Sequence, residues 1–98
     1  MVVVEVAQFK LKVDADEAAF VAAEHQLAKG IILQQPGFIR REMTKGADGQ
    51  WLVIMHWESE AAGEAWGPKM MQDPAAPAFV SQLEFSSMRK AYYQSMTV

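Results

Sequence analysis

His56 carries the side chain best suited to acid–base chemistry in this 98-residue chain. Histidine titrates close to neutral pH, so it can take a proton from a substrate and return it. It stands in a mostly apolar, strand-like stretch, Gln50–Glu58, which leaves two interpretations open. His56 is either a general base that contacts a phenolic substrate or a structural histidine that a polar neighbour satisfies. Buried polar groups are more often simply paired.

Trp66, Arg40 and Arg41 are the next candidates for ligand contact. An indole can stack on a flat ligand in a pocket wall, and it can equally pack in the core beneath a helix. The two arginines point to opposite faces of one predicted strand. One of them could bind an anionic or enol oxygen. Pairing with Glu42 or Glu58 is the more usual arrangement for such charged side chains.

Glu5 is unusual because it shares a strand face with apolar residues. It is either a carboxylic acid held neutral by burial or, as we favour, one half of a salt bridge across a dimer. Tyr92 and Tyr93 are adjacent on a predicted strand, so at most one of them can enter a given pocket. Several methionines could line an adaptable pocket or fill gaps in the core: Met43, Met55, Met70, Met71 and Met88.

The composition excludes several classes of protein. The chain has no cysteine, hence no disulfide, thiolate nucleophile or Cys-ligated metal. Its two histidines lack a nearby carboxylate pattern, so we expect no metal site. The formal net charge of -3 argues against a nucleic-acid partner. No apolar run reaches the roughly 20 residues of a membrane span, so we expect no membrane partner. The length predicts one domain, residues 1–98. There is no basic leader before a long apolar run, so we expect no signal peptide, and the absence of cysteine fits a cytoplasmic protein.

The stretch Gln50–Glu58 must position these side chains, because it has the composition of a central strand. Alternate residues point to opposite faces, and both faces are apolar for most of its length. Both faces therefore need a cover. Helices can cover one of them. A chain this short has little left for the other, so we predict a homodimer in which a second copy covers it.

The first half of the chain predicts a strand over residues 2–13, then a helix. Asp14 is the predicted N-cap, since Glu17 follows at the spacing of a capping box. The helix should continue to about Leu33, with Glu24 pointing outward. The segment that contains Pro36 should then break the helix, because proline cannot continue it. A second strand covers residues 38–45. Strict alternation puts Ile39, Arg41 and Met43 on one face and Phe38 on the other.

The second half predicts two helices and a last strand. Ser59 caps a helix over residues 60–71, with a break expected near Gly67 and Pro68. Asp73 and Pro74 start a short helix that ends near residue 83. A final strand covers about 88–96. The element order is that of an α+β, ferredoxin-like split βαβ fold with a four-stranded antiparallel sheet.

Several short segments resemble the antibiotic biosynthesis monooxygenase family: Pro36-Gly37-Phe38, Trp57-Glu58-Ser59, Glu60-Ala61-Ala62 and Trp66. The resemblance implies a dimeric α/β barrel in which two sheets pair, with a pocket between sheet and helices in each subunit. Members oxidise anthrones or quinols without a cofactor, or degrade haem. The resemblance implies a pocket role for Trp66 alone. From the residues themselves we expect Trp57, Met55, Arg41 and Tyr92 to bind the substrate as well, and His56 is the candidate catalytic base.

The catalytic residues of the family match this chain only at Trp66. Haem-degrading members also use an Asn, whose place is Ala7 here, and a His near residues 77–79, where this chain has none. Anthrone-oxidising members place an Asn where Ala62 stands and a Tyr near Gln72. The resemblance therefore implies no cofactor and a possible monooxygenase for a small aromatic, enolisable (quinol- or anthrone-like) substrate. The alternative is a non-catalytic barrel that binds a small apolar ligand or acts as an accessory module.

Overall fold

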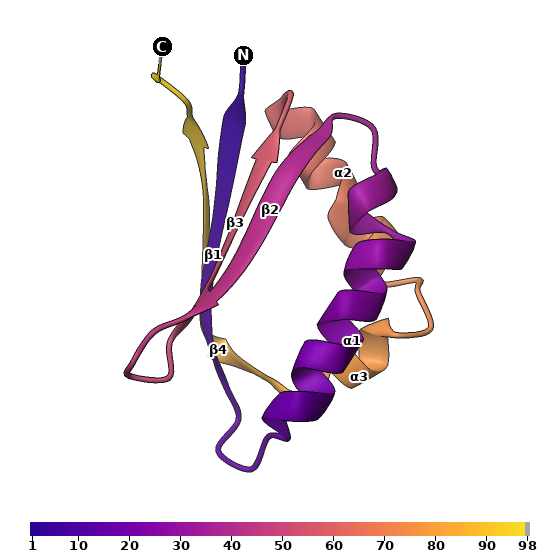
Figure 1. The fold of residues 1–98 in the computed structure, drawn as a ribbon, viewed down its shortest axis with the longest axis vertical. Coiled ribbons are helices and arrows are strands. Elements are labelled where there is room, and N and C mark those ends of the chain that lie inside the picture. The colour runs from indigo at the N-terminus through magenta and orange to yellow at the C-terminus, as the bar shows by residue number, and fades with distance from the viewer. Residues whose placement is uncertain (98) are drawn as a thin grey trace.

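A four-stranded antiparallel sheet with helices packed on one face forms the computed structural model, which describes residues 1–97 (Figure 1). The strand order across the sheet is β2-β3-β1-β4. The predicted α+β, ferredoxin-like element order is confirmed. The elements in chain order are β1 (Val3–Leu11), α1 (Glu17–Gly30), the short 3₁₀ helix η1 (Ile32–Gln34), β2 (Phe38–Lys45), β3 (Trp51–Trp57), α2 (Glu60–Met70), α3 (Ala76–Val80) and β4 (Leu83–Gln94).

The helix-facing side of β3 forms the centre of the core, as its apolar alternation predicts. Trp51, Val53, Met55 and Trp57 are all buried there. The ring of Phe20 on α1 packs edge-on to Trp51, with ring centroids 5.1 Å apart. Aromatic side chains bury large areas, so this contact contributes strongly to docking α1 on the sheet.

Nothing within residues 1–97 covers the opposite face of the sheet (Figure 1). Leu52, Ile54 and His56 of β3 lie on it and are partly exposed. Val4 and Val6 of β1 pair with His56 and Ile54, so they extend the same apolar surface. The prediction that helices would cover only one face is thus confirmed. The second copy predicted for the other face stays a prediction.

Helix α1 starts later and ends earlier than the sequence pattern suggests. Its N-cap is Asp16, whose Oδ1 accepts a hydrogen bond from the Ala19 backbone N–H at 3.1 Å, so the predicted cap at Asp14 is wrong. Asp16 has the extended backbone that a cap needs. The helix ends at Gly30 and η1 replaces its predicted last turn.

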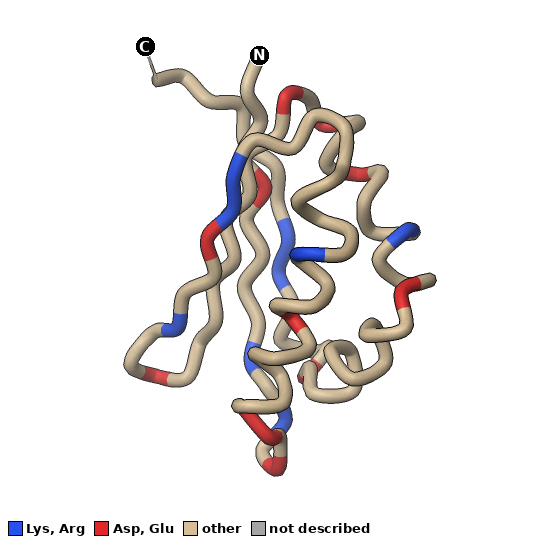
Figure 2. Tube along the Cα trace, turned by 45° about the vertical axis from the view of Figure 1, so that its right-hand side comes forward, with Lys and Arg blue, Asp and Glu red and all other residues tan. Residues whose placement is uncertain are grey.

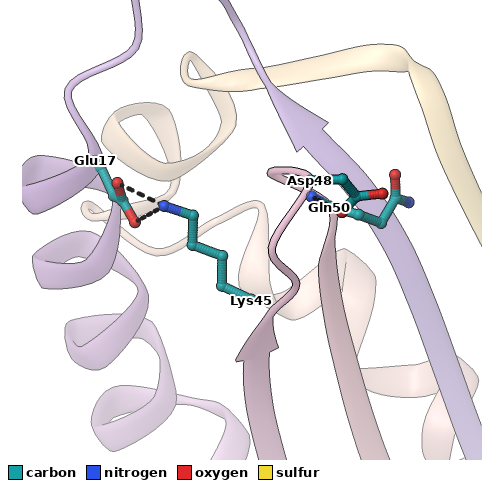
Figure 3. A network of polar contacts seen from close by, with 4 residues as sticks. All are labelled: Glu17, Lys45, Asp48 and Gln50. Atoms are coloured by element: carbon teal, nitrogen blue, oxygen red, sulfur yellow. Dashed lines mark hydrogen bonds and ion pairs between the residues drawn. The ribbon is translucent and has the colours of Figure 1, made fainter.

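Two polar contacts stabilise the end of the sheet where β2 turns into β3 (Figure 3). Lys45 Nζ at the end of β2 donates to Glu17 Oε1 at 2.9 Å and Oε2 at 3.1 Å, which ties β2 to the first turn of α1. Asp48 Oδ1 accepts from the Gln50 backbone N–H at 3.0 Å. Gly49 in this hairpin has a φ of 82°, a left-handed conformation that glycine adopts without strain.

A β-bulge at the start of β2 corrects the predicted face of Phe38. Phe38 pairs with Trp57 and Arg40 pairs with His56, so Ile39 is the extra residue. The bulge turns Phe38 to the helix side, where its ring packs edge-on to Trp57 at 5.6 Å. Strict alternation cannot reveal an inserted residue, because the bulge belongs to the strand pair.

The second half of the fold differs from the prediction in three elements, α2, α3 and β4. Ser59 caps α2 as predicted, since its hydroxyl oxygen accepts from the Ala62 N–H at 3.1 Å. The predicted break is wrong, because α2 runs through Gly67 and Pro68 to Met70. Pro68 removes one backbone bond to the carbonyl four residues earlier, at the exposed Glu64, where water can replace it. Helix α3 is shorter than predicted, and β4 begins at Leu83 with a bulge opposite residues 8–10.

Charged residues of both signs are interspersed along the described trace, without a long run of one sign (Figure 2). Among residues 1–97, no helix is long and apolar enough to cross a membrane. The same residues contain no group of three or more His, Cys, Asp or Glu side chains that could hold a metal ion.

Candidate ligand-binding cavity

An apolar cavity of about 270 Å³ lies between the helix-facing side of the sheet and the helices. Its sheet side includes Ala7, Val53 and Met55. Leu27 of α1 and Trp66 of α2 belong to its helix side. Ligand pockets for drug-sized molecules typically measure about 300–1,000 Å³, so this cavity suits a small ligand.

Three neighbouring strands place polar groups on either side of Met55. In the sheet, Met55 pairs with Arg41 on β2 and with Glu5 on β1. Residues paired across antiparallel strands share a face, so all three side chains point toward the helices. Adjacent strands lie about 4.8 Å apart, which separates the Arg41 and Glu5 backbones by about 10 Å. In the next row Ala7 pairs with Val53, and its small side chain leaves room above the sheet.

Glu5 is the most buried charged group of the site, at 1% exposed. Its Oε1 accepts hydrogen bonds from Trp57 Nε1 at 3.0 Å and from Trp66 Nε1 at 3.1 Å. Lys90 Nζ on β4 lies 3.4 Å from the other oxygen, Oε2. Oε2 is buried and accepts no hydrogen bond from the described residues. The salt bridge expected across a dimer is therefore formed within the chain, with Lys90.

Glu24 and Arg41 form a second buried ion pair in the cavity wall. The Glu24 side chain is 4% exposed and that of Arg41 is 13% exposed. The prediction that Glu24 points outward is wrong, as is the pairing of Arg41 with Glu42 or Glu58. Glu24 stands four residues after Phe20, so helical spacing places it on the buried stripe, a signal already present in the sequence.

Lys90 connects Glu5 to the aromatic groups around it. Its Nζ lies 5.8 Å from the centroid of the Trp66 ring and 5.5 Å from that of Tyr92. Burial acts to lower the pKa of Lys90, but Glu5 and Tyr92 outweigh it and raise the pKa above its ordinary value of 10.5. Burial raises the pKa of Tyr92 above 10.0, although Lys90 acts in the opposite direction. Lys90 is thus held as a cation beside the carboxylate.

The structure brings three of the five residues predicted for substrate binding to the cavity and places the other two beside it. Met55, Arg41 and Trp66 line it. Trp57 does not, but its indole holds Glu5. Tyr92 pairs with Glu5 in the sheet and lies just outside the lining. The sequence reasoning did not single out Lys90, because only the strand pairing of β1 with β4 brings it to Glu5.

His56 lies on the opposite face of the sheet from this cavity. It borders a second depression, of about 290 Å³, together with Arg40, Arg41, Glu42 and Ile54. Its Nδ1 is buried and forms no hydrogen bond with the described residues. Any ligand in the first cavity is therefore separated from His56 by the sheet. Its role as a base stays a prediction.

The protein is an α+β domain with a ferredoxin-like sheet. The cavity between this sheet and the helices is the candidate site for a small molecule. The sequence profile of the antibiotic biosynthesis monooxygenase family matches residues 2–68, so the chain belongs to this family. The predicted family is thereby confirmed. Comparison with curated protein sequences finds no match.

Solved structures agree with this fold at low sequence identity. SnoaB, a cofactor-independent oxygenase from Streptomyces nogalater, matches with a TM-score of 0.74 and 17% identity over 99% of this chain and 95% of its own. Rv0793 from Mycobacterium tuberculosis matches with a TM-score of 0.70 and 14% identity over 100% and 98%. A conserved protein from Methanosarcina mazei matches with a TM-score of 0.72 and 13% identity over 96% and 92%. At such identities the likeness supports the fold alone.

Proposed function

We propose that the protein is a cofactor-independent monooxygenase that acts on a small aromatic, enolisable substrate of the quinol or anthrone type. The observation that carries the proposal is the apolar cavity, in which Trp66 is held by its hydrogen bond to the buried Glu5. A fixed indole in an apolar wall suits a flat aromatic ring. Membership of the family and the described activity of SnoaB support the same class of reaction.

The proposed chemistry converts an activated methylene into a carbonyl. Removal of a proton leaves a carbanion, stabilised as an enolate, which transfers electrons to dissolved O₂ and forms a peroxide. The peroxide takes up a proton and loses water, so the methylene and O₂ yield a carbonyl and one H₂O. The protein's tasks are to deprotonate the substrate and to keep the cavity dry.

The proposed functional unit is a homodimer that pairs the uncovered faces of two sheets. Val4, Val6 and Ile54 contribute to that face in each subunit. Tyr93 pairs with Val4, and its side chain is 57% exposed in the single chain. Covering an apolar surface of this kind stabilises an assembly in proportion to the area removed from water.

A non-catalytic barrel that binds a small apolar ligand is the second candidate. The observation that favours it is the composition of the cavity, where Ala7 stands in the place of the first-strand Asn of haem-degrading members. Ala62 and Gln72 likewise stand where anthrone-oxidising members carry functional side chains. Such a protein would use the same cavity and Trp66 for binding alone.

Oxygen consumption separates the two candidates. Purified protein is incubated in air with a panel of anthrones and quinols, and the oxygen uptake is recorded with an electrode. The monooxygenase predicts uptake above the rate of spontaneous oxidation, with one water formed per carbonyl. Ligand-induced quenching of tryptophan fluorescence without oxygen uptake would instead establish the binding protein.

A further inference from the structure

We propose that Glu5 is the proton acceptor of the cavity and that its Oε2 receives the proton from the substrate. This inference rests on the proposed function, since it names the base that such a reaction needs. Glu5 and Glu24 are the two buried carboxylates of the cavity wall among the described residues. Each has one oxygen that accepts no hydrogen bond from the described residues and each faces a cation, Arg41 for Glu24 and Lys90 for Glu5. The Arg41 side chain is 13% exposed and contacts Glu24 directly. Lys90 Nζ lies 3.4 Å from Glu5 Oε2 and its side chain is 40% exposed, so Oε2 is the oxygen more open to a ligand.

The two oxygens of Glu5 have separate roles in this arrangement. Oε1 is saturated by the indoles of Trp57 and Trp66, at 3.0 and 3.1 Å. These two donors come from β3 and α2, so the carboxylate is held from two sides. Oε2 accepts no hydrogen bond from the described residues. A buried acceptor without a donor is costly, and a ligand hydroxyl or an acidic C–H is the donor that the cavity can bring to it.

The neighbours of Glu5 hold its carboxylate in a fixed position for the transfer. Both indole N–H groups donate to an anionic oxygen, and Lys90 Nζ lies 3.4 Å from Oε2. In the proposed step the substrate C–H bond breaks, its electron pair remains on the substrate as an enolate, and an O–H bond forms at Oε2. The ammonium of Lys90 lies beside the place where the enolate charge develops.

Lys90 also supplies a connection to water. Its side chain is 40% exposed, whereas that of Glu5 is 1% exposed. Water that reaches the ammonium of Lys90 lies beside Oε2, so a proton taken up by Glu5 can exchange with that water, while Lys90 itself stays a cation. The consequence is measurable without oxygen: the protein should exchange the acidic hydrogens of an enolisable ketone with deuterium.

The test uses 2-tetralone, an enolisable two-ring ketone, in D₂O under anaerobic conditions, with deuterium incorporation followed by NMR. Wild-type protein should accelerate the exchange, and Glu5→Gln should lose about 100-fold or more of that acceleration. The amide keeps an oxygen for the two indoles but cannot accept the proton. Glu60→Gln, which removes an exposed carboxylate at the start of α2, is the matched control and should exchange like the wild type. Full exchange by Glu5→Gln, or its loss in His56→Gln alone, would overturn the proposal.

A comparison of two ligands on the wild-type protein decides the question if Glu5→Gln does not fold. 2-Naphthol presents a hydroxyl to Oε2, and 2-methoxynaphthalene has the same rings without the donor. A hydrogen bond to a charged group is expected to favour 2-naphthol by about 10-fold or more. Equal affinity would overturn the proposal. Exchange without oxygen uptake would retain Glu5 as a base and reject the oxygenase, whereas oxygen uptake without exchange would retain the oxygenase and reject Glu5.

Discussion

Trp66 Nε1 donates a hydrogen bond to Glu5 Oε1 at 3.1 Å and thereby joins α2 to β1 above the cavity. The two residues are 61 positions apart in the chain. Glu5 is buried, and Trp66 is partly buried over the cavity it lines. This one bond sets the orientation of the indole that the proposed function uses for ring stacking. It also makes ligand binding and local stability depend on the same contact.

Replacement of Trp66 by phenylalanine should weaken both properties. Trp66→Phe keeps an aromatic ring but removes the donor to Glu5, and a hydrogen bond to a charged group contributes about 1.5–3 kcal/mol. We expect a loss of unfolding free energy toward the lower end of that range, because Trp57 still donates to Oε1. Urea denaturation measures the loss.

A double-mutant cycle with Glu5→Gln isolates the contact between the two side chains. If the bond is responsible, the combined variant should lose less stability than the sum of the single variants. Strict additivity would show that Trp66 acts through packing alone and that its orientation does not depend on Glu5.

The buried pair of Glu24 and Arg41 predicts a strong asymmetry between single and double substitution. Arg41→Met leaves the Glu24 carboxylate, 4% exposed, without its cation, which should cost about 3–5 kcal/mol of stability. The double variant Glu24→Leu/Arg41→Met replaces the pair by apolar side chains and should recover most of that loss. Both are measured by urea denaturation.

The exposed pair of Glu17 and Lys45 provides the control for this comparison. Its side chains are 50% and 45% exposed, so Lys45→Met should change stability by about 1 kcal/mol or less. A loss of the same size for Arg41→Met would mean that the Glu24 carboxylate is hydrated in solution and is not a buried charge.

Local sequence patterns predict most of the helices and strands but few of the contacts in the cavity. Ser59 as a helix cap and the alternation of Trp51–Trp57 depend on neighbours within a few residues, so the sequence predicts them directly. The predicted face of Phe38 is wrong because a β-bulge depends on how two strands pair, and one strand's sequence does not show it. The contact of Glu5 with Lys90 depends on the pairing of the first and last strands, which no local pattern reveals.

Stability should fall with rising pH above pH 10 because of Lys90 and Tyr92. The pKa of Lys90 is raised above 10.5 in the folded protein. The stabilisation that the Lys90 cation contributes to the folded state is therefore fully present below pH 10.5 and is lost as pH rises through the folded pKa. The pKa of Tyr92 is raised above 10.0, so the unfolded chain loses this proton first and unfolding is favoured in the same direction. Urea midpoints measured between about pH 9 and pH 11 report the slope.

Tyr92→Phe separates the two groups. The substitution removes the titrating hydroxyl of Tyr92 and its effect on the pKa of Lys90. The decrease of the urea midpoint with pH above pH 10 should therefore be shallower than in the wild type. Tyr93→Phe is the matched control, because Tyr93 lies on the opposite face of β4 and is 57% exposed. An unchanged slope in Tyr92→Phe would locate the alkaline sensitivity elsewhere in the chain.

The proposed homodimer predicts that a charge on the uncovered sheet face abolishes assembly. Ile54 on β3 lies next to Glu42 in the sheet, so Ile54→Glu places two carboxylates side by side on an apolar surface. We expect sedimentation velocity at micromolar concentration to show a dimer for the wild type and a folded monomer for Ile54→Glu. Leu33→Glu is the control, because Leu33 in η1 is 52% exposed and lies outside the sheet. A wild-type protein that sediments as a folded monomer, with apolar Val4, Val6 and Ile54 in water, would reject the sheet-to-sheet dimer, since burial of that face is the only force the proposal invokes.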